Sequence, residues 1–160
     1  MTTDRGKAAL AAAQAYRPEI VRFLREMIAI PAESGKEGAR CERALAEFRA
    51  LGFDEAHFDG LGSVVARLGS GPLKILMDGH IDCVGVGDRE AWPHDPFAGK
   101  LEDGKVYGRG AVDELPAIAC MAYGARILAE RGVPPGVTVW LCASVLEEDC
   151  DGYPLMHLIE

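Results

Sequence analysis

Three short clusters of histidine and carboxylate residues are the parts of this sequence whose types could do chemistry: Gly79-His80-Ile81-Asp82, Gly108-Arg109-Gly110-Ala111-Val112-Asp113 and Glu147-Glu148-Asp149. Imidazole with several carboxylates is a donor set that favours zinc and also allows manganese or cobalt. A cation held by such residues lowers the pKa of bound water, and a spare carboxylate can act as general base. The clusters therefore indicate amide hydrolysis without a covalent intermediate.

His80 and Asp82 are two positions apart, so in an extended chain they project to the same side, and the carboxylate can orient the imidazole. Asp113 follows a Gly-x-Gly turn and precedes a predicted helix, where its two oxygens could bridge two cations. If Asp113 stood alone, an ordinary helix N-cap would be the better interpretation.

Glu147 and Glu148 are adjacent acids at the end of an apolar run. Burying such charges is unfavourable unless a cation or hydrogen bonds compensate them, so we expect a positive group nearby. Because neighbouring strand residues point in opposite directions, both acids can serve one site only where the chain begins to turn. The alternative is a solvated strand end, which would apply if the other clusters were missing.

The elements that must position these clusters are two buried strands with a helix between them. Leu73 to Met77 and Val137 to Val145 are apolar runs typical of strands buried on both faces, and residues 116–131 have helical spacing. Strand, helix, strand predicts a right-handed crossover and an α/β fold with a mainly parallel sheet flanked by helices. In such sheets, ligands bind at the carboxyl ends of the strands.

Other segments complete this predicted fold. Residues 4–30 are expected to be helical with an interruption at Pro18, residues 37–51 form a further helix that ends at Gly52, and Leu101 to Tyr107 is a hairpin built on an Asp-Gly turn.

Composition narrows the classes of partner. The net charge is -8 and no cluster of Lys and Arg is present, which argues against nucleic acid. The sequence shows no signal peptide and no apolar run long enough to span a membrane, so a membrane partner is not expected and we predict a cytoplasmic protein. The five cysteines form an odd, widely spaced set that suits reduced thiols.

The order of these motifs resembles the catalytic half of M20-type metallopeptidases and amidohydrolases. That family includes acetylornithine deacetylase, succinyl-diaminopimelate desuccinylase, aminoacylase and glutamate carboxypeptidase. The resemblance rests on His80-x-Asp82, then Trp92, Asp95-Pro96-Phe97, the segment Tyr107-Gly108-Arg109-Gly110-Ala111-x-Asp113, and Glu147-Glu148. The finer patterns Glu-Glu-Asp-Cys-Asp-Gly and His-Ile-Asp-Cys-Val-Gly look closest to a selenium-metabolism-linked subgroup.

The resemblance implies a three-layer, zinc-peptidase-like domain and a role for each site residue. His80 would bind one zinc ion, Asp113 would bridge two, and Glu148 would bind the other, with cobalt or manganese as alternatives. Glu147 would be the general base, and Asp82 would orient His80. The implied substrates are small N-acyl amino acids or peptides.

The sequence departs from the family pattern in two respects. The family has Asp-x-Lys-Gly where this chain has Asp113-Glu114-Leu115-Pro116. The family also continues with a further acidic ligand, a lid and dimerisation domain that forms a homodimer, and a late histidine ligand. Residues 1–160 are therefore expected to be the N-terminal part of a catalytic domain that is incomplete at its C-terminus. The alternative function is a noncatalytic remnant that binds metal weakly or acts only with a companion polypeptide.

Overall fold

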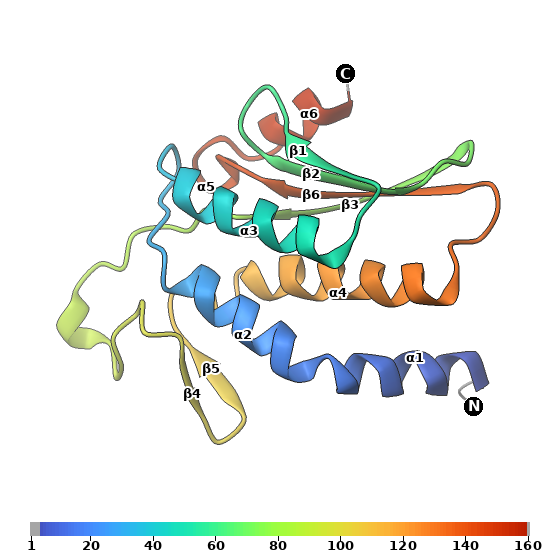
Figure 1. Ribbon diagram of the computed structural model, residues 1–160. Coiled ribbons are helices and arrows are strands. Elements are labelled where there is room, and N and C mark those ends of the chain that lie inside the picture. The colour runs from blue at the N-terminus through green and yellow to red at the C-terminus, as the bar shows by residue number, and fades with distance from the viewer. Residues whose placement is uncertain (1–3, 160) are drawn as a thin grey trace.

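The sheet contains four strands in the order β1-β2-β6-β3, and a computed structural model describes it within residues 4–159 (Figure 1). β3 and β6 are parallel, whereas β1 pairs with β2 and β2 pairs with β6 in antiparallel fashion. The strands are β1 (Glu55–Phe58), β2 (Val64–Gly69), β3 (Leu73–His80) and β6 (Val137–Ser144). The predicted α/β architecture and the pairing of the two apolar runs are confirmed.

The expectation of a mainly parallel sheet is wrong, because the sheet is mixed. Two parallel neighbouring strands must be joined by a long crossover connection. In this sheet the helix between β3 and β6 provides such a crossover, and these two strands are the parallel pair. β2 and β3 are joined by residues 70–72, and β6 inserts between them. At Gly71 an added Cβ would lie 1.8 Å from the backbone carbon of Gly136, so only glycine lets this short connection pass the start of β6.

Helices cover one face of the sheet, with α4 (Leu115–Arg131) on β3 and β6 and α3 (Gly38–Leu51) on β1 and β2. α2 (Arg17–Ile28) packs against both of these helices, and α1 (Asp4–Ala15) runs along α4. α6 (Tyr153–Ile159) lies on the opposite face of the sheet (Figure 1). The helix interruption predicted at Pro18 is confirmed, since α2 begins at Arg17 with a proline in its first turn.

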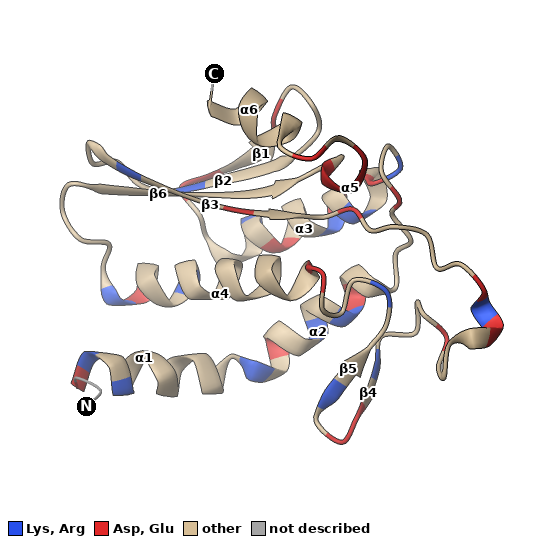
Figure 2. Ribbon diagram, turned by 180° about the vertical axis from the view of Figure 1, so that it is seen from behind, with Lys and Arg blue, Asp and Glu red and all other residues tan. Residues whose placement is uncertain are grey.

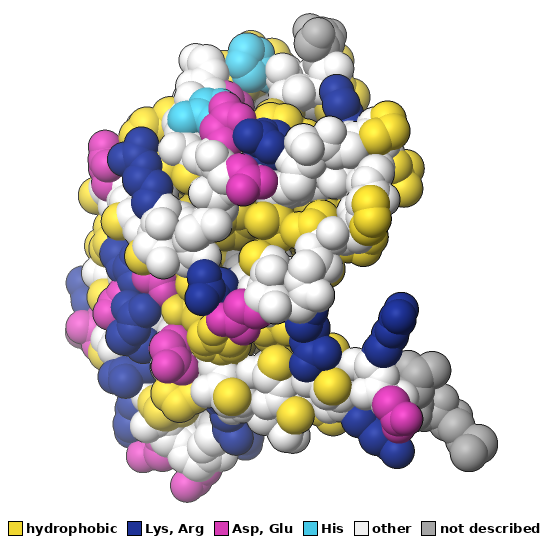
Figure 3. Space-filling view, turned by 45° about the vertical axis from the view of Figure 1, so that its right-hand side comes forward, with side chains coloured by type: hydrophobic (Ala, Val, Ile, Leu, Met, Phe, Trp, Pro, Cys, Tyr) yellow, Lys and Arg dark blue, Asp and Glu magenta, His cyan; other side chains and the backbone are white. Residues whose placement is uncertain are grey.

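The main core lies between the sheet and these helices. Its fully buried members come from α2, α3, α4 and the inner face of the strands, and include Phe23, Met27, Phe48, Val64, Ile118 and Leu141. On the face shown in Figure 3, Lys and Arg side chains are interspersed with Asp and Glu. Among the ion pairs of the helices, Arg43 of α3 pairs with Glu26 of α2 and with Glu47 on its own helix.

The prediction that Leu73 to Met77 is buried on both faces is wrong for most of the run. Leu73 is 59% exposed, Ile75 44% and Leu76 38%. One reason is the position of β3 at the edge of the sheet, where it pairs with β6 on one side only within residues 4–159. The other is that Leu76 lies on the face opposite α4, beside Trp140 and Leu158.

The smaller elements are β4 (Lys100–Glu102), β5 (Lys105–Tyr107), a 3-10 turn η1 (Arg89–Ala91) and α5 (Glu147–Cys150). β4 and β5 form the hairpin predicted from the Asp-Gly turn. Within residues 4–159 none of the helices combines the length and the apolar character that crossing a membrane requires.

Candidate metal centre

The three polar clusters meet at the carboxyl ends of β3 and β6. His80 is the last residue of β3 and lies in register with Ser144, the last residue of β6. α4 begins directly after the second cluster, and α5 carries the third, so acidic residues from both gather at this end of the sheet (Figure 2). The parallel pairing produces this convergence, because it places both carboxyl ends at the same edge.

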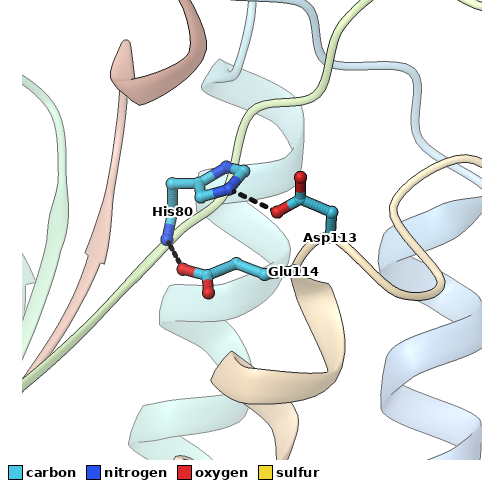
Figure 4. Close-up of side chains that lie close together, drawn as sticks. All are labelled: His80, Asp113 and Glu114. Atoms are coloured by element: carbon cyan, nitrogen blue, oxygen red, sulfur yellow. Dashed lines mark hydrogen bonds and ion pairs between the residues drawn. The ribbon is translucent and has the colours of Figure 1, made fainter. Parts of the chain in front are cut away.

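The imidazole of His80 lies between carboxylates and is 7% exposed. Its Nδ1 is 3.0 Å from the carbonyl oxygen of Asp82 and 3.5 Å from that residue's carboxylate. Its Nε2 is 3.0 Å from Oδ1 of Asp113 (Figure 4) and 3.7 Å from Oε2 of Glu147. Since the neighbours of Nδ1 only accept hydrogen bonds, Nδ1 carries a proton, and Nε2 is the nitrogen available to a cation.

The surroundings of His80 strongly favour its protonated form. The hydrogen bond to Asp82 and, next among the favourable contacts, the one to Asp113 raise the pKa of His80 to about 10, although burial opposes the shift. A cation at Nε2 must therefore displace a proton at neutral pH.

Asp82 is fully buried and acts as the hub of the site. It accepts hydrogen bonds from Ser34 Oγ at 2.6 Å and from the backbone N–H groups of Glu147 and Glu148 at 3.2 and 3.1 Å. Burial works against ionisation of Asp82, but the bonds from His80, Ser34 and these amides hold its pKa below the usual value. Asp82 thus remains a carboxylate that holds His80 and the turn after β6 together.

The chain turns immediately after β6, which is the condition for Glu147 and Glu148 to serve one site. Leu146 has a left-handed backbone conformation with φ of 64°, and α5 begins at the next residue. Glu147 faces His80, and burial raises the pKa of its carboxyl, with a further contribution from Glu148. Glu148 instead accepts a hydrogen bond from the backbone N–H of Val84 at 3.2 Å.

The residues whose donor atoms lie within 4.8 Å of one another, among those that the structure describes, are His80, Asp113 and Glu114 (Figure 4). Imidazole and carboxylates fit a borderline divalent cation such as zinc. The structure thus brings two of the predicted metal residues together. Glu148 lies outside this group, so its role as a ligand stays a prediction.

Glu114 is a site residue beside His80 that sequence reasoning missed. Its Oε1 accepts a hydrogen bond from the backbone N–H of His80 at 2.6 Å. The sole signal was its position next to Asp113, because the family pattern specifies no residue type there. The departures that follow have structural roles: Leu115 is fully buried, and Pro116 lies in the first turn of α4. The peptide bond between Asp113 and Glu114 is cis.

A cavity of about 300 Å³ adjoins the site through Val84, the residue that contacts Glu148. Its wall includes Arg109, which stacks over Trp92 at 5.1 Å and donates a hydrogen bond to the carbonyl oxygen of Gly85. Trp92 in turn donates to the carbonyl oxygen of Val86 at 2.8 Å. These contacts hold the loop after Asp82 in place.

The chain resembles known proteins in sequence over most of its length. Residues 76–160 match the model of peptidase family M20/M25/M40. The protein YgeY of Escherichia coli (strain K12), described as uncharacterized, is 38% identical over 154 residues, which are 96% of this chain and 38% of that protein. A succinyl-diaminopimelate desuccinylase of Methylobacterium nodulans is 46% identical over 81 residues, or 50% of this chain and 20% of that enzyme. The chain thus spans about two fifths or less of these relatives.

Solved structures share the fold at low sequence identity. The dipeptidase Dug1p of Saccharomyces cerevisiae superimposes with a TM-score of 0.81 at 19% identity, covering 96% of this chain and 37% of that one. Human carnosine dipeptidase 1 gives a TM-score of 0.75 at 24% identity over the same shares of the two chains.

Proposed function

Because the chain belongs to peptidase family M20/M25/M40, we propose that it forms part of a metal-dependent hydrolase of amide bonds in small N-acyl amino acids or peptides. The observation that carries this proposal is the position of His80 Nε2, which faces Asp113 at 3.0 Å and Glu147 at 3.7 Å. Relatives named as a desuccinylase and neighbours named as dipeptidases support the substrate class.

In this proposal His80, Asp113 and Glu148 hold a pair of zinc ions, with cobalt or manganese as alternatives. Asp113 suits a bridging role because its side chain is 75% exposed and has one oxygen directed at His80. When bound, the cations would polarise the substrate carbonyl and lower the pKa of water. Glu148 accepts a hydrogen bond from the backbone N–H of Val84 and would exchange this contact for one with the cation.

The chain's own residues supply the proton transfer. Glu147 would accept the proton of the attacking water and pass it to the leaving amine. Its raised pKa suits both steps, since a base that is too acidic holds a proton poorly. Asp82 does not touch the substrate in this scheme; it fixes the ring of His80 and the backbone that carries Glu147.

The relatives' remaining length supports a second part of the proposal, namely that residues 1–160 are the N-terminal part of the catalytic domain. Three ligands cannot complete two tetrahedral or five-coordinate sites. We therefore expect this chain alone to bind zinc weakly and to hydrolyse amides poorly or not at all. In this proposal further polypeptide supplies the remaining ligands, the lid and the dimer interface.

A cytoplasmic location is proposed from the five free cysteines.

The test uses this chain alone and the same chain joined to the remaining part of the E. coli relative. Zinc binding is measured by calorimetry, and release of amino acid is measured from N-acetyl and N-succinyl amino acids and from dipeptides. Glu147→Gln removes the base, and Glu42→Gln is the matched control, since Glu42 is exposed on α3. We expect turnover from the joined protein only, its loss in Glu147→Gln, and no change in Glu42→Gln. Zinc-dependent turnover that survives Glu147→Gln would refute the assigned base.

A further inference from the structure

The loop between α2 and α3 reaches the metal centre, although it lies far from it in the sequence. Ser34 donates a hydrogen bond of 2.6 Å to Oδ2 of Asp82, and Glu37 accepts a bond of 3.0 Å from the backbone N–H of Leu146. Glu37 is 5% exposed, and the same oxygen also accepts the N–H of Gly35 at 2.9 Å. A buried carboxylate is thus directed at the turn that precedes the two glutamates.

The two loop contacts act on adjacent parts of one turn. Glu37 fixes the N–H of Leu146, which has the left-handed conformation that starts α5. Ser34 fixes Asp82, whose oxygens accept the N–H groups of the next two residues, Glu147 and Glu148. Three successive backbone N–H groups are therefore held by carboxylates, and both carboxylates belong to, or are bonded to, the same loop.

The loop itself has other anchors. Arg40 is fully buried and donates to the carbonyl oxygens of Ile30 and Ile81, and the N–H of Cys83 bonds to the carbonyl oxygen of Ala32. These contacts hold the loop against the end of β3 without using Ser34 or Glu37. Removing the Ser34 hydroxyl should therefore loosen the turn at residues 146–148 while leaving the fold intact.

We propose that Ser34 and Glu37 are positioning residues that set the placement of Glu147 and Glu148 at the metal centre, without contact with the cation or substrate. The part of this inference that concerns zinc affinity rests on the proposed function. Its physical basis is that partners around a metal site fix ligand orientation, and their removal typically reduces metal affinity about 10-fold or more.

The test combines amide hydrogen exchange of the metal-free chain with zinc affinity. Ser34→Ala is compared with Ser34→Thr, which keeps the hydroxyl, and with Ser70→Ala, which alters an exposed serine in the β2–β3 connection. Glu37→Leu is compared with Glu37→Gln, which keeps an oxygen acceptor, and with Glu42→Leu at an exposed position of α3. Circular dichroism and thermal unfolding establish that each variant is folded.

We expect faster exchange at Glu147 and Glu148 in Ser34→Ala, and faster exchange at Leu146 in Glu37→Leu. Zinc affinity should fall about 10-fold in Ser34→Ala and recover in Ser34→Thr. Folded variants with wild-type exchange and wild-type affinity would overturn the inference, and Ser34→Ala decides it if Glu37→Leu does not fold. If the wild-type chain binds no zinc, the proposed metal centre is wrong, whereas exchange still decides whether the loop positions the turn.

Discussion

The two ends of β3 differ sharply in burial and in the contacts that the rest of the chain makes with them. At the carboxyl end, Gly79, His80, Ile81 and Asp82 are buried, and polar contacts arrive from the segments around Ser34, Asp113 and Leu146. At the other end, Leu73 and Ile75 expose apolar side chains, and the outer edge of β3 has no partner strand among residues 4–159.

The contrast separates two properties that one strand carries. The polar end has its hydrogen-bonding partners within this chain, so its geometry is defined here. The apolar end is an open strand edge of the kind that proteins usually cover, charge or keep short. The chemistry-bearing end of β3 is thus specified more completely than the apolar run that leads to it.

The largest expected effect is at Asp82. Asp82→Ala would leave the Ser34 hydroxyl and two backbone N–H groups without their acceptor and would remove the partner of a protonated His80. We expect the free energy of unfolding to fall by about 3–5 kcal/mol, as for other broken buried charge pairs. Urea unfolding measures it, with Asp149→Ala on the exposed part of α5 as control. A loss no larger than that of the control would mean that the polar end is not held by this hub.

How much of this contrast could be predicted from the sequence depends on how local the signal is. The β3–α4–β6 unit and the approach of His80 to Asp113 follow from apolar runs that end in polar clusters, so both were predicted. Ser34 and Glu37 were not, because they lie 48 and 109 residues from their partners and share no motif with them. Glu114 depends on the direction of one side chain, which no spacing reveals.

The exposure of β3 could not be predicted for a different reason. An apolar run indicates that a strand can be buried on both faces, but it does not say whether the strand lies at the centre or at the edge of the sheet, or which face the helices cover. The mixed sheet escaped prediction because the order of the strands depends on β6 inserting between β2 and β3, past Gly71.

An intermediate effect is expected from pH, and it sharpens the contrast by isolating His80. The folded-state pKa of about 10 lies above the ordinary value of 6.5, so the stabilisation is fully present below about pH 6.5 and is lost as pH rises toward 10. We expect the stability difference between wild type and His80→Gln, without metal, to shrink by about 1–3 kcal/mol over that range. Parallel pH profiles would contradict the assignment.

Zinc should reverse the sign of this pH dependence. A cation at Nε2 replaces the proton on that nitrogen. At any pH below the pKa of His80, a rise in pH therefore favours zinc binding. Thermal unfolding with excess zinc should therefore show a stabilisation by metal that increases with pH, and this increase should be absent in His80→Gln.

The smallest expected effect is at the exposed end of β3. Leu73→Ser and Ile75→Ser should each change the free energy of unfolding by no more than about 0.5 kcal/mol, because these residues are 59% and 44% exposed. Leu141→Ala, at a fully buried position in register with Met77 of β3, is the apolar control and should cost about 3 kcal/mol.

Urea unfolding at low and high protein concentration shows whether the exposed end of β3 is covered by a second copy of the chain or by the chain itself. A cost above about 1.5 kcal/mol that grows with protein concentration would show that a second copy covers the edge, since open strand edges pair readily with one another. The same cost without concentration dependence would mean that these side chains are buried within the single chain, and the contrast between the two ends of β3 would then be lost.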